Sequence, residues 1–190
     1  MTTEPSDAPL VWIDCEMTGL DTTNDVILQV YCFVTDASLT LLEPNGWGAV
    51  VHHPDATLSA MGEWCTRTHA STGLTAAVRA SQTSPADASA SLLRYIQSLV
   101  PEPRTALLAG NSVHADKAFL ASPPYDAVLA HLHYRILDVS SIKEAARRWA
   151  PPEMLRDAPR KKGLHEAKED ILESIEEARF YKERFFASSR

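Results

Sequence analysis

The sequence contains few cysteines and no long apolar run, and both shortages exclude broad classes of protein. Its three cysteines, Cys15, Cys32 and Cys65, are an odd number and lack the close spacing of a zinc site. They argue against a disulfide-stabilised secreted domain and are expected to be reduced thiols of an intracellular protein. No apolar run reaches the about 20 residues that a membrane-spanning helix requires.

Basic residues are also scarce. The 18 Lys and Arg residues are outnumbered by 25 Asp and Glu residues, which gives a net charge of −7. This balance argues against broad, charge-driven binding to long nucleic acids, which usually requires a basic surface. It leaves room for a short substrate with few phosphates, because bound cations would offset a cluster of acids. A Walker loop, a glycine-rich dinucleotide-binding motif and an H-E-x-x-H motif are all missing.

The length of 190 residues suits a single domain with a sizeable core. We expect a flexible N-terminus over residues 1–9 and one domain over residues 10–190. The polar, acidic start MTTEPSDAP resembles neither a secretory signal nor an arginine-rich transit peptide. An intracellular location is therefore expected, in the cytoplasm, or in the mitochondrion if a longer precursor exists.

Hydrophobic patterns predict a mixed α/β architecture. Strands are expected at 10–15, 26–34, 47–52, 106–109 and 134–138, and helices at 58–69, 74–80, 85–99, around Asp116 and at 140–149. The first three strands are joined by short connections, which predicts an antiparallel meander. A last helix follows an exposed, proline-containing loop over 151–162, and its core-facing stripe comprises Ala167, Ile171, Ile175, Ala178, Tyr181 and Phe185. Strands followed by alternating helices favour a mixed sheet flanked by helices.

Four acidic residues are candidate metal ligands. Asp14 and Glu16 lie two apart on an expected strand, so both side chains project from one face, while Cys15 points into the core. Such a pair is common without function, but converging carboxylates repel each other unless a cation lies between them. Together with Asp116 and Asp170 they offer hard oxygen ligands suited to Mg²⁺ or Mn²⁺. Two such ions about 4 Å apart can hold both oxygens of an in-line displacement.

His165 is the candidate general base, since a neutral histidine can take a proton from an attacking water. It lies five residues before Asp170, which corresponds to a rotation of about 140° on a continuous helix. For both residues to serve one centre, His165 must precede the helix or lie in a loosened first turn. We expect it on a mobile segment that closes on substrate. The alternative is that the helix begins earlier and His165 is a solvated residue.

Several strings of the sequence closely resemble the oligoribonucleases, of the DEDDh group of 3′→5′ exonucleases. The strings are VWIDCEMTGLD, AGNSVHADKAFL, HYRILDVSSIKEAARRW and HEAKEDILESIEEARFYKERFF. The resemblance covers about residues 10–186. It implies a ribonuclease H-like fold with a five-stranded sheet, in which Asp14, Glu16, Asp116 and Asp170 converge on two Mg²⁺ or Mn²⁺ ions and His165 is the base. It also implies 3′→5′ hydrolysis of very short RNA, preferentially dinucleotides, to nucleoside 5′-monophosphates.

The resemblance also assigns substrate contacts. By their match to the family strings, Leu20 would wedge against a base, Trp64 would stack on one, and His69 would line the site. Ser112, Arg135 and Ser140 would cap a terminal phosphate at the far end of the substrate. Tyr134 would be supplied by a neighbouring subunit, which implies a homodimer. Core packing is the alternative for Trp64, and without the resemblance Tyr134 would more often be interpreted as a strand-face aromatic.

Two other functions compete with this one. A DNA-trimming or proofreading exonuclease of the same group would share the acids, but the HYRILDVSS string favours an oligoribonuclease. A catalytically silent RNA-binding or scaffold module is disfavoured because all four acids and the histidine are present. The chain departs from many relatives at Gln29, where they have a glutamate. No departure removes an expected ligand.

Overall fold

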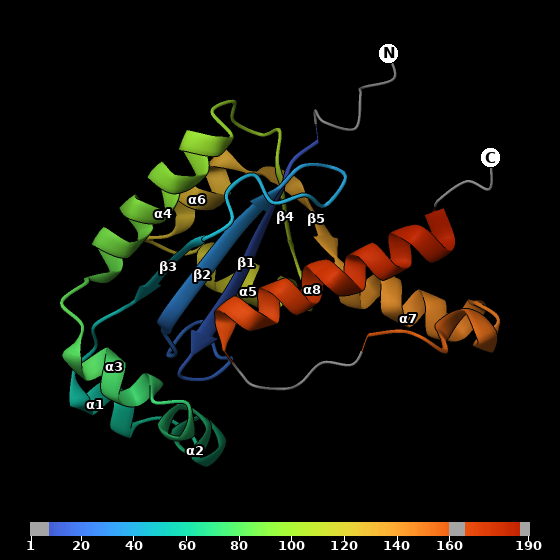
Figure 1. The fold of residues 1–190 in the computed structure, drawn as a ribbon. Coiled ribbons are helices and arrows are strands. Elements are labelled where there is room, and N and C mark those ends of the chain that lie inside the picture. The colour runs from blue at the N-terminus through green and yellow to red at the C-terminus, as the bar shows by residue number, and fades with distance from the viewer. Residues whose placement is uncertain (1–7, 160–165, 187–190) are drawn as a thin grey trace.

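The structure, a computed structural model, describes residues 8–159 and 166–186 (Figure 1). Its five strands form one sheet in the order β3-β2-β1-β4-β5. The strands are β1 (Leu10–Met17), β2 (Ile27–Thr35), β3 (Trp47–Val50), β4 (Leu107–Gly110) and β5 (His133–Asp138). The α-helices are α1 (Asp55–Ser59), α2 (Glu63–Ser71), α3 (Leu74–Ala80), α4 (Pro85–Leu99), α5 (His114–Leu120), α6 (Asp126–His131), α7 (Val139–Trp149) and α8 (Ala167–Tyr181), with a 3-10 turn η2 (Pro152–Leu155) and a π-helical end η3 (Lys182–Phe186). The expected five-stranded mixed sheet flanked by helices is confirmed.

The topology of the sheet places three strand ends at one edge. Strands β1, β2 and β3 form the expected antiparallel meander, whereas β4 pairs in parallel with both β1 and β5. Because β1, β4 and β5 run in the same direction, their carboxyl ends meet at the same edge of the sheet. In open α/β sheets this edge is where ligands usually bind.

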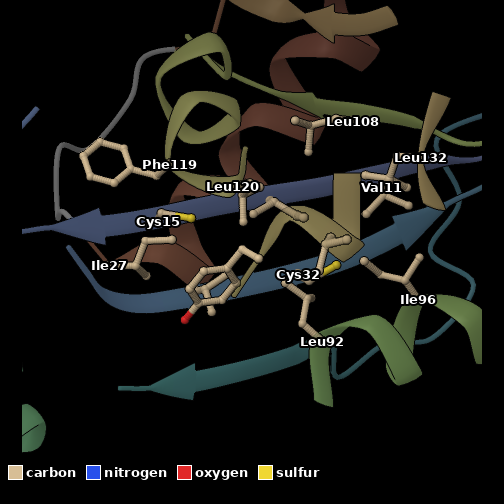
Figure 2. Packing of buried hydrophobic residues seen from close by; sticks show 14 of the residues in the cluster. Val11, Cys15, Ile27, Cys32, Leu92, Ile96, Leu108, Phe119, Leu120 and Leu132 are labelled. Atoms are coloured by element: carbon tan, nitrogen blue, oxygen red, sulfur yellow. The ribbon is translucent and has the colours of Figure 1, made fainter. Parts of the chain in front are cut away.

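Alternation along β1 divides its side chains between two cores. Val11, Ile13 and Cys15 face α4, where they pack in one buried cluster with residues such as Leu92 and Ile96 (Figure 2). Cys15 therefore packs in the core, as expected.

The opposite face of the sheet is covered by α7 and α8 (Figure 1). Trp12 packs there against Ile171 and Ile175 of α8. By the same period of two, Asp14 and Glu16 share this face with Trp12. The expected stripe on α8 is buried from Ala167 to Tyr181, and Phe185 is half-buried.

The structure differs from the expected helices and loops in several places. The helix expected at 58–69 is two helices, because α1 ends at Ser59 and Gly62 is the extended N-cap residue of α2. Helix α6 was not expected, since six residues are too few to establish a helical period. Within the described part of the expected loop over 151–162, residues Pro152–Leu155 form a 3-10 turn. No helix in the described ranges is long and apolar enough to cross a membrane.

Candidate active site

Three of the four predicted ligands converge at the carboxyl end of β1. Asp14 and Glu16 project toward α8, and Asp170 lies in the first turn of that helix. Each offers a carboxylate oxygen, and these oxygens all lie within 4.8 Å of one another. Residues separated by more than 150 positions in the sequence are thus brought together, because α8 packs directly across β1 and β2.

The fourth predicted ligand, Asp116, lies beside this cluster. It is buried in the first turn of α5, and its Oδ1 accepts a hydrogen bond from the backbone N–H of Cys15 at 2.9 Å. That contact places its carboxyl group against the residue between Asp14 and Glu16. The three-carboxylate group defined by the 4.8 Å limit does not include Asp116.

Burial makes the carboxyl groups of Glu16 and Asp116 hard to ionise. Burial, then the charges of Asp170 and Asp116, raises the pKa of Glu16 to about 7. Burial likewise raises the pKa of Asp116 to about 6, although hydrogen bonds from Cys15 and its own backbone oppose the change. Uncompensated negative charge is therefore costly here, and a cation would remove that cost. The donor set and its electrostatics fit a divalent metal ion.

His69 lies behind Glu16 as a buried residue of α2. Its Nε2 is 2.9 Å from the backbone oxygen of Met17, so the proton is assigned to Nε2. Its Nδ1 lies 3.9 Å from Oε2 of Glu16 and makes no hydrogen bond among the described residues. The expected place of His69 in the site wall is consistent with this position.

A cleft of about 450 Å³ opens over the acids. Its walls include Leu20, Trp64 and His69, together with Asp14, Glu16 and Asp170. Leu20 is 77% exposed and Trp64 is 52% exposed. Both side chains are therefore accessible from the cleft, and their contact with a base stays a prediction.

The loop bearing Leu20 is held in place by Asp25. This carboxylate accepts hydrogen bonds from Oγ1 of Thr18 at 2.7 Å and from the backbone N–H of Asp21 at 2.9 Å. Gly19 runs so close to Asp25 that an added Cβ would lie 2.8 Å from the carboxyl carbon. The glycine thus permits the approach that fixes the loop.

Two of the predicted cap residues meet at the ends of β4 and β5. Ser112 follows β4 with a φ of 52°, and its Oγ lies 3.2 Å from Oγ of Ser140 at the start of α7. Asp138 joins the segment after β4 to the start of α7. Its Oδ1 accepts hydrogen bonds from the backbone N–H of Ser112 at 3.0 Å and from that of Ser140 at 2.9 Å. This hydroxyl pair lies at the same sheet edge as the acids.

Tyr134 and Arg135, two further residues predicted to contact the substrate, lie on β5, which is an edge strand of the sheet. Tyr134 is 71% exposed, and its ring stacks on that of His133. The guanidinium of Arg135 lies 5.2 Å from the centroid of the Tyr134 ring. Lys117 donates to the backbone oxygen of Tyr134 at 3.0 Å, which fixes the strand here.

His165 lies outside the described residues. The helix that bears Asp170 begins at Ala167, two positions later in the sequence. Its role as the base remains a prediction.

Comparison with known proteins identifies the family. The exonuclease family matches residues 11–178. A probable oligoribonuclease of Schizosaccharomyces pombe is 47% identical over 174 residues, covering 92% of this chain and 67% of its own. The oligoribonuclease of Nocardia farcinica is 45% identical, covering 96% of this chain and 83% of its own, and the mitochondrial oligoribonuclease of Bos taurus is 43% identical, covering 93% and 73%. The chain belongs to the oligoribonucleases, within the exonuclease family. It is a nuclease, a hydrolase of phosphodiester bonds.

Solved structures agree on the fold of this oligoribonuclease-family chain. Exonuclease I from Methylocaldum szegediense has a TM-score of 0.68 at 17% identity, covering 95% of this chain and 41% of that one. Exonuclease I of E. coli, in complex with a dT13 oligonucleotide, has a TM-score of 0.69 at 14% identity, covering 93% and 41%. These likenesses support the ribonuclease H-like arrangement of sheet and helices.

Two residues of this oligoribonuclease site were not singled out from the sequence. Asp138 precedes a helical pattern, which is a typical N-cap signal that could have found it. Asn111 lies between Ser140 and α8, and only the tertiary structure reveals its contacts.

Proposed function

We propose that the protein is a 3′→5′ exoribonuclease that degrades very short RNA, preferentially dinucleotides, to nucleoside 5′-monophosphates. The observation that carries the proposal is the shared sheet edge. It presents the acids at the end of β1 and the Ser112–Ser140 hydroxyl pair at the ends of β4 and β5. Adjacent strands are about 4.8 Å apart, so the two anchors are separated by roughly one or two strand spacings.

Asp14, Glu16 and Asp170, with Asp116 beside them, would hold Mg²⁺ or Mn²⁺, two ions per site. When bound, such ions stabilise the charge of an in-line displacement at phosphorus. His165 would serve as the general base that accepts the proton of the attacking water. The buried carboxyl of Asp116 is fixed by the Cys15 N–H, so it would need little reorganisation to serve as a ligand.

Substrate would lie in the cleft, with its bases against Leu20 and Trp64. Stacking on an aromatic face is tolerant of base identity, which suits an enzyme acting on short RNA of any sequence. Ser112, Ser140 and Arg135 would bind the terminal 5′ phosphate, because hydroxyls and a guanidinium fork recognise phosphate oxygens well. Two anchors at a fixed separation would admit a dinucleotide and leave little room for a third nucleotide.

A homodimer in which Tyr134 enters the partner's site is part of the proposal. Tyr134 is an exposed aromatic on an edge strand, and β5 leads directly into α7. At the far end of α7, the exposed rings of Trp149 and Phe186 flank an apolar groove of about 300 Å³. A second copy would cover such surfaces. The proposed location is inside the cell, in the cytoplasm or in the mitochondrion, the place given in the name of the bovine relative.

The test compares a 5′-phosphorylated RNA dinucleotide, a longer RNA and the corresponding DNA dinucleotide. We expect nucleoside 5′-monophosphates, a higher kcat/KM for the RNA dinucleotide, activity with Mg²⁺ or Mn²⁺, little activity with Ca²⁺ and none in EDTA. Asp116→Asn should remove most turnover. Asp126→Asn changes an exposed acid in the first turn of α6 and should not. Near-normal activity in EDTA would contradict the metal mechanism, and faster cleavage of the longer RNA would contradict the length preference.

A further inference from the structure

A chain of polar contacts connects the hydroxyl pair to the helix that carries Asp170. Its centre is Asn111, the residue directly after β4. Oδ1 of Asn111 accepts a hydrogen bond from Oγ of Ser140 at 2.9 Å. Its Nδ2 donates to Oγ of Ser174 at 2.9 Å and to Oε2 of Glu177 at 3.0 Å, both on α8.

The chain reaches the backbone at both ends. On one side, Oγ of Ser140 accepts from the backbone N–H of Ser112 at 3.0 Å. On the other side, Oγ of Ser174 donates to the backbone oxygen of Asp170 at 2.7 Å. Three side chains, those of Ser140, Asn111 and Ser174, therefore join the main chain of Ser112 to that of Asp170.

The direction of each hydrogen bond along this chain is determined. The carboxylate of Glu177 only accepts, so the amide of Asn111 must present its nitrogen to α8 and its oxygen to Ser140. The hydroxyl of Ser140 then donates its single proton to Asn111. Ser112 must therefore be the donor in the 3.2 Å contact between the two hydroxyls. A phosphate that accepts from Ser112 would take over this one donor and leave the rest of the chain unchanged.

Glu177 anchors the chain in the interior. It is 2% exposed, and its Oε1 is paired with Nζ of Lys143 at 3.0 Å and accepts from Oη of Tyr181 at 3.3 Å. With Asn111 on its other oxygen, the buried carboxylate is well satisfied. Such a network favours one arrangement, because displacing Asn111 would remove a partner from the buried side chains of Ser174 and Glu177.

We infer that Asn111 is a positioning residue that fixes the separation between the Ser112–Ser140 hydroxyl pair and the carboxylate of Asp170, and that it thereby sets the substrate length the enzyme prefers. The inference rests on the proposed function, in which the terminal phosphate binds at the hydroxyl pair and Asp170 serves the scissile phosphate. Within the pair, Ser112 is the donor to the phosphate and Ser140 holds Ser112 in place. Asn111 touches neither phosphate and acts through Ser140 and Ser174.

The experiment measures kcat and KM for a 5′-phosphorylated dinucleotide and for a longer RNA. Asn111→Leu keeps the approximate size of the side chain and removes every polar contact. Ser174→Ala removes the hydroxyl that joins Asn111 to the backbone oxygen of Asp170, and it keeps the contact of Asn111 with Glu177. Ser89→Ala is a matched control, because Ser89 is 4% exposed against 3% for Ser174 and also donates to a backbone oxygen, that of Pro124 at 2.6 Å.

We expect the preference for the dinucleotide over the longer RNA to fall about tenfold in Asn111→Leu and about threefold in Ser174→Ala, as the loss of one or more half-buried hydrogen bonds predicts. The loss should lie in a raised KM for the dinucleotide, with the longer RNA nearly unaffected. Ser89→Ala should keep the wild-type preference. Thermal denaturation shows whether each variant is folded. If Asn111→Leu does not fold, the result for Ser174→Ala decides whether the polar chain sets the length preference.

Two outcomes are to be distinguished. If the wild-type enzyme prefers dinucleotides and both variants slow every substrate by the same factor, or Ser89→Ala flattens the preference equally, Asn111 is only structural and this inference is wrong while the proposed function stands. If the wild-type enzyme itself shows no preference for dinucleotides, the proposed function fails, and the inference fails with it.

Discussion

At the scale of single residues, the raised pKa of Glu16 connects the site to the stability of the protein. The folded-state pKa is about 7 against an ordinary 4.5, so the metal-free folded state holds a proton that the unfolded state has lost. Glu16 should therefore lower the free energy of unfolding by roughly 3 kcal/mol as the pH rises from about 4.5 to 7. Asp116, whose pKa is raised to about 6, should add to this decrease. Urea unfolding in EDTA across this range measures the slope.

Two controls isolate this effect. Glu16→Gln cannot titrate at this position, so its slope should be smaller than that of the wild type. Mg²⁺ should restore stability above pH 7 in the wild type, because a cation stabilises the ionised carboxylates. If the wild type and Glu16→Gln share the same slope in EDTA, Glu16 does not titrate as its burial predicts.

His165 gives a second prediction at this scale. His165→Ala should lower kcat far more than it weakens binding, because a positioned general base contributes about 10²–10⁴-fold in rate. The dinucleotide should still bind, since the acids, Trp64 and the hydroxyl pair remain. Single-turnover rates and equilibrium binding in Ca²⁺ separate the two effects. Normal turnover with much weaker binding would assign His165 to substrate contact instead.

At the scale of elements, the loop between β1 and β2 gives a prediction with an internal control. In Gly19→Ala the new Cβ would displace the carboxylate of Asp25, which holds the loop through Thr18 and Asp21. We expect a loss of about 1–2 kcal/mol in stability and a raised KM as Leu20 shifts. Gly62→Ala should leave KM unchanged, because nothing lies within 4 Å of the Cβ it would add. Equal effects of the two substitutions on KM would contradict the role of the loop.

Strand β5 gives the test of the length selection. Arg135→Ala should lower kcat/KM for the dinucleotide roughly 10- to 100-fold, because a hydrogen bond to a charged group contributes about 1.5–3 kcal/mol. The longer RNA should lose less, since it cannot use the cap fully. The same substitution at Arg94, an exposed arginine of α4, is the control. If Arg135→Ala slows every length by one factor, the guanidinium has a general electrostatic role and the length selection lies elsewhere.

The elements also show which parts of the structure could be predicted from the sequence. Alternation on β1 separates Cys15 from Asp14 and Glu16, and a period of two is visible in the sequence itself. The meander follows from short connections. The contact between Asp116 and the backbone of Cys15 spans 101 positions, and no local pattern contains it. The link from Asn111 to α8 spans 63 to 66 positions and depends on how α8 packs, which periodicity does not specify.

At the scale of the whole molecule, the exposed face of β5 and α7 bears on assembly. Tyr134 on β5 is 71% exposed, and the exposed rings of Trp149 and Phe186 flank an apolar groove at the end of α7. In the proposed homodimer, each active site combines its own acids with Tyr134 of the partner. The Tyr134→Ala and Asp116→Ala proteins should then be inactive for different reasons. The first lacks the tyrosine, and the second lacks an acid.

Mixing the two inactive proteins therefore should restore activity. In each mixed dimer, one site has intact acids and receives an intact tyrosine, so complete exchange of equal amounts in a closed twofold dimer predicts about a quarter of wild-type activity. Replacing Asp116→Ala in the mixture by the double variant Tyr134→Ala/Asp116→Ala removes every intact tyrosine and should abolish the rescue. Native mass spectrometry establishes whether subunits have exchanged. Subunit exchange without restored activity would mean that Tyr134 acts within its own subunit. Catalysis would then not require the homodimer.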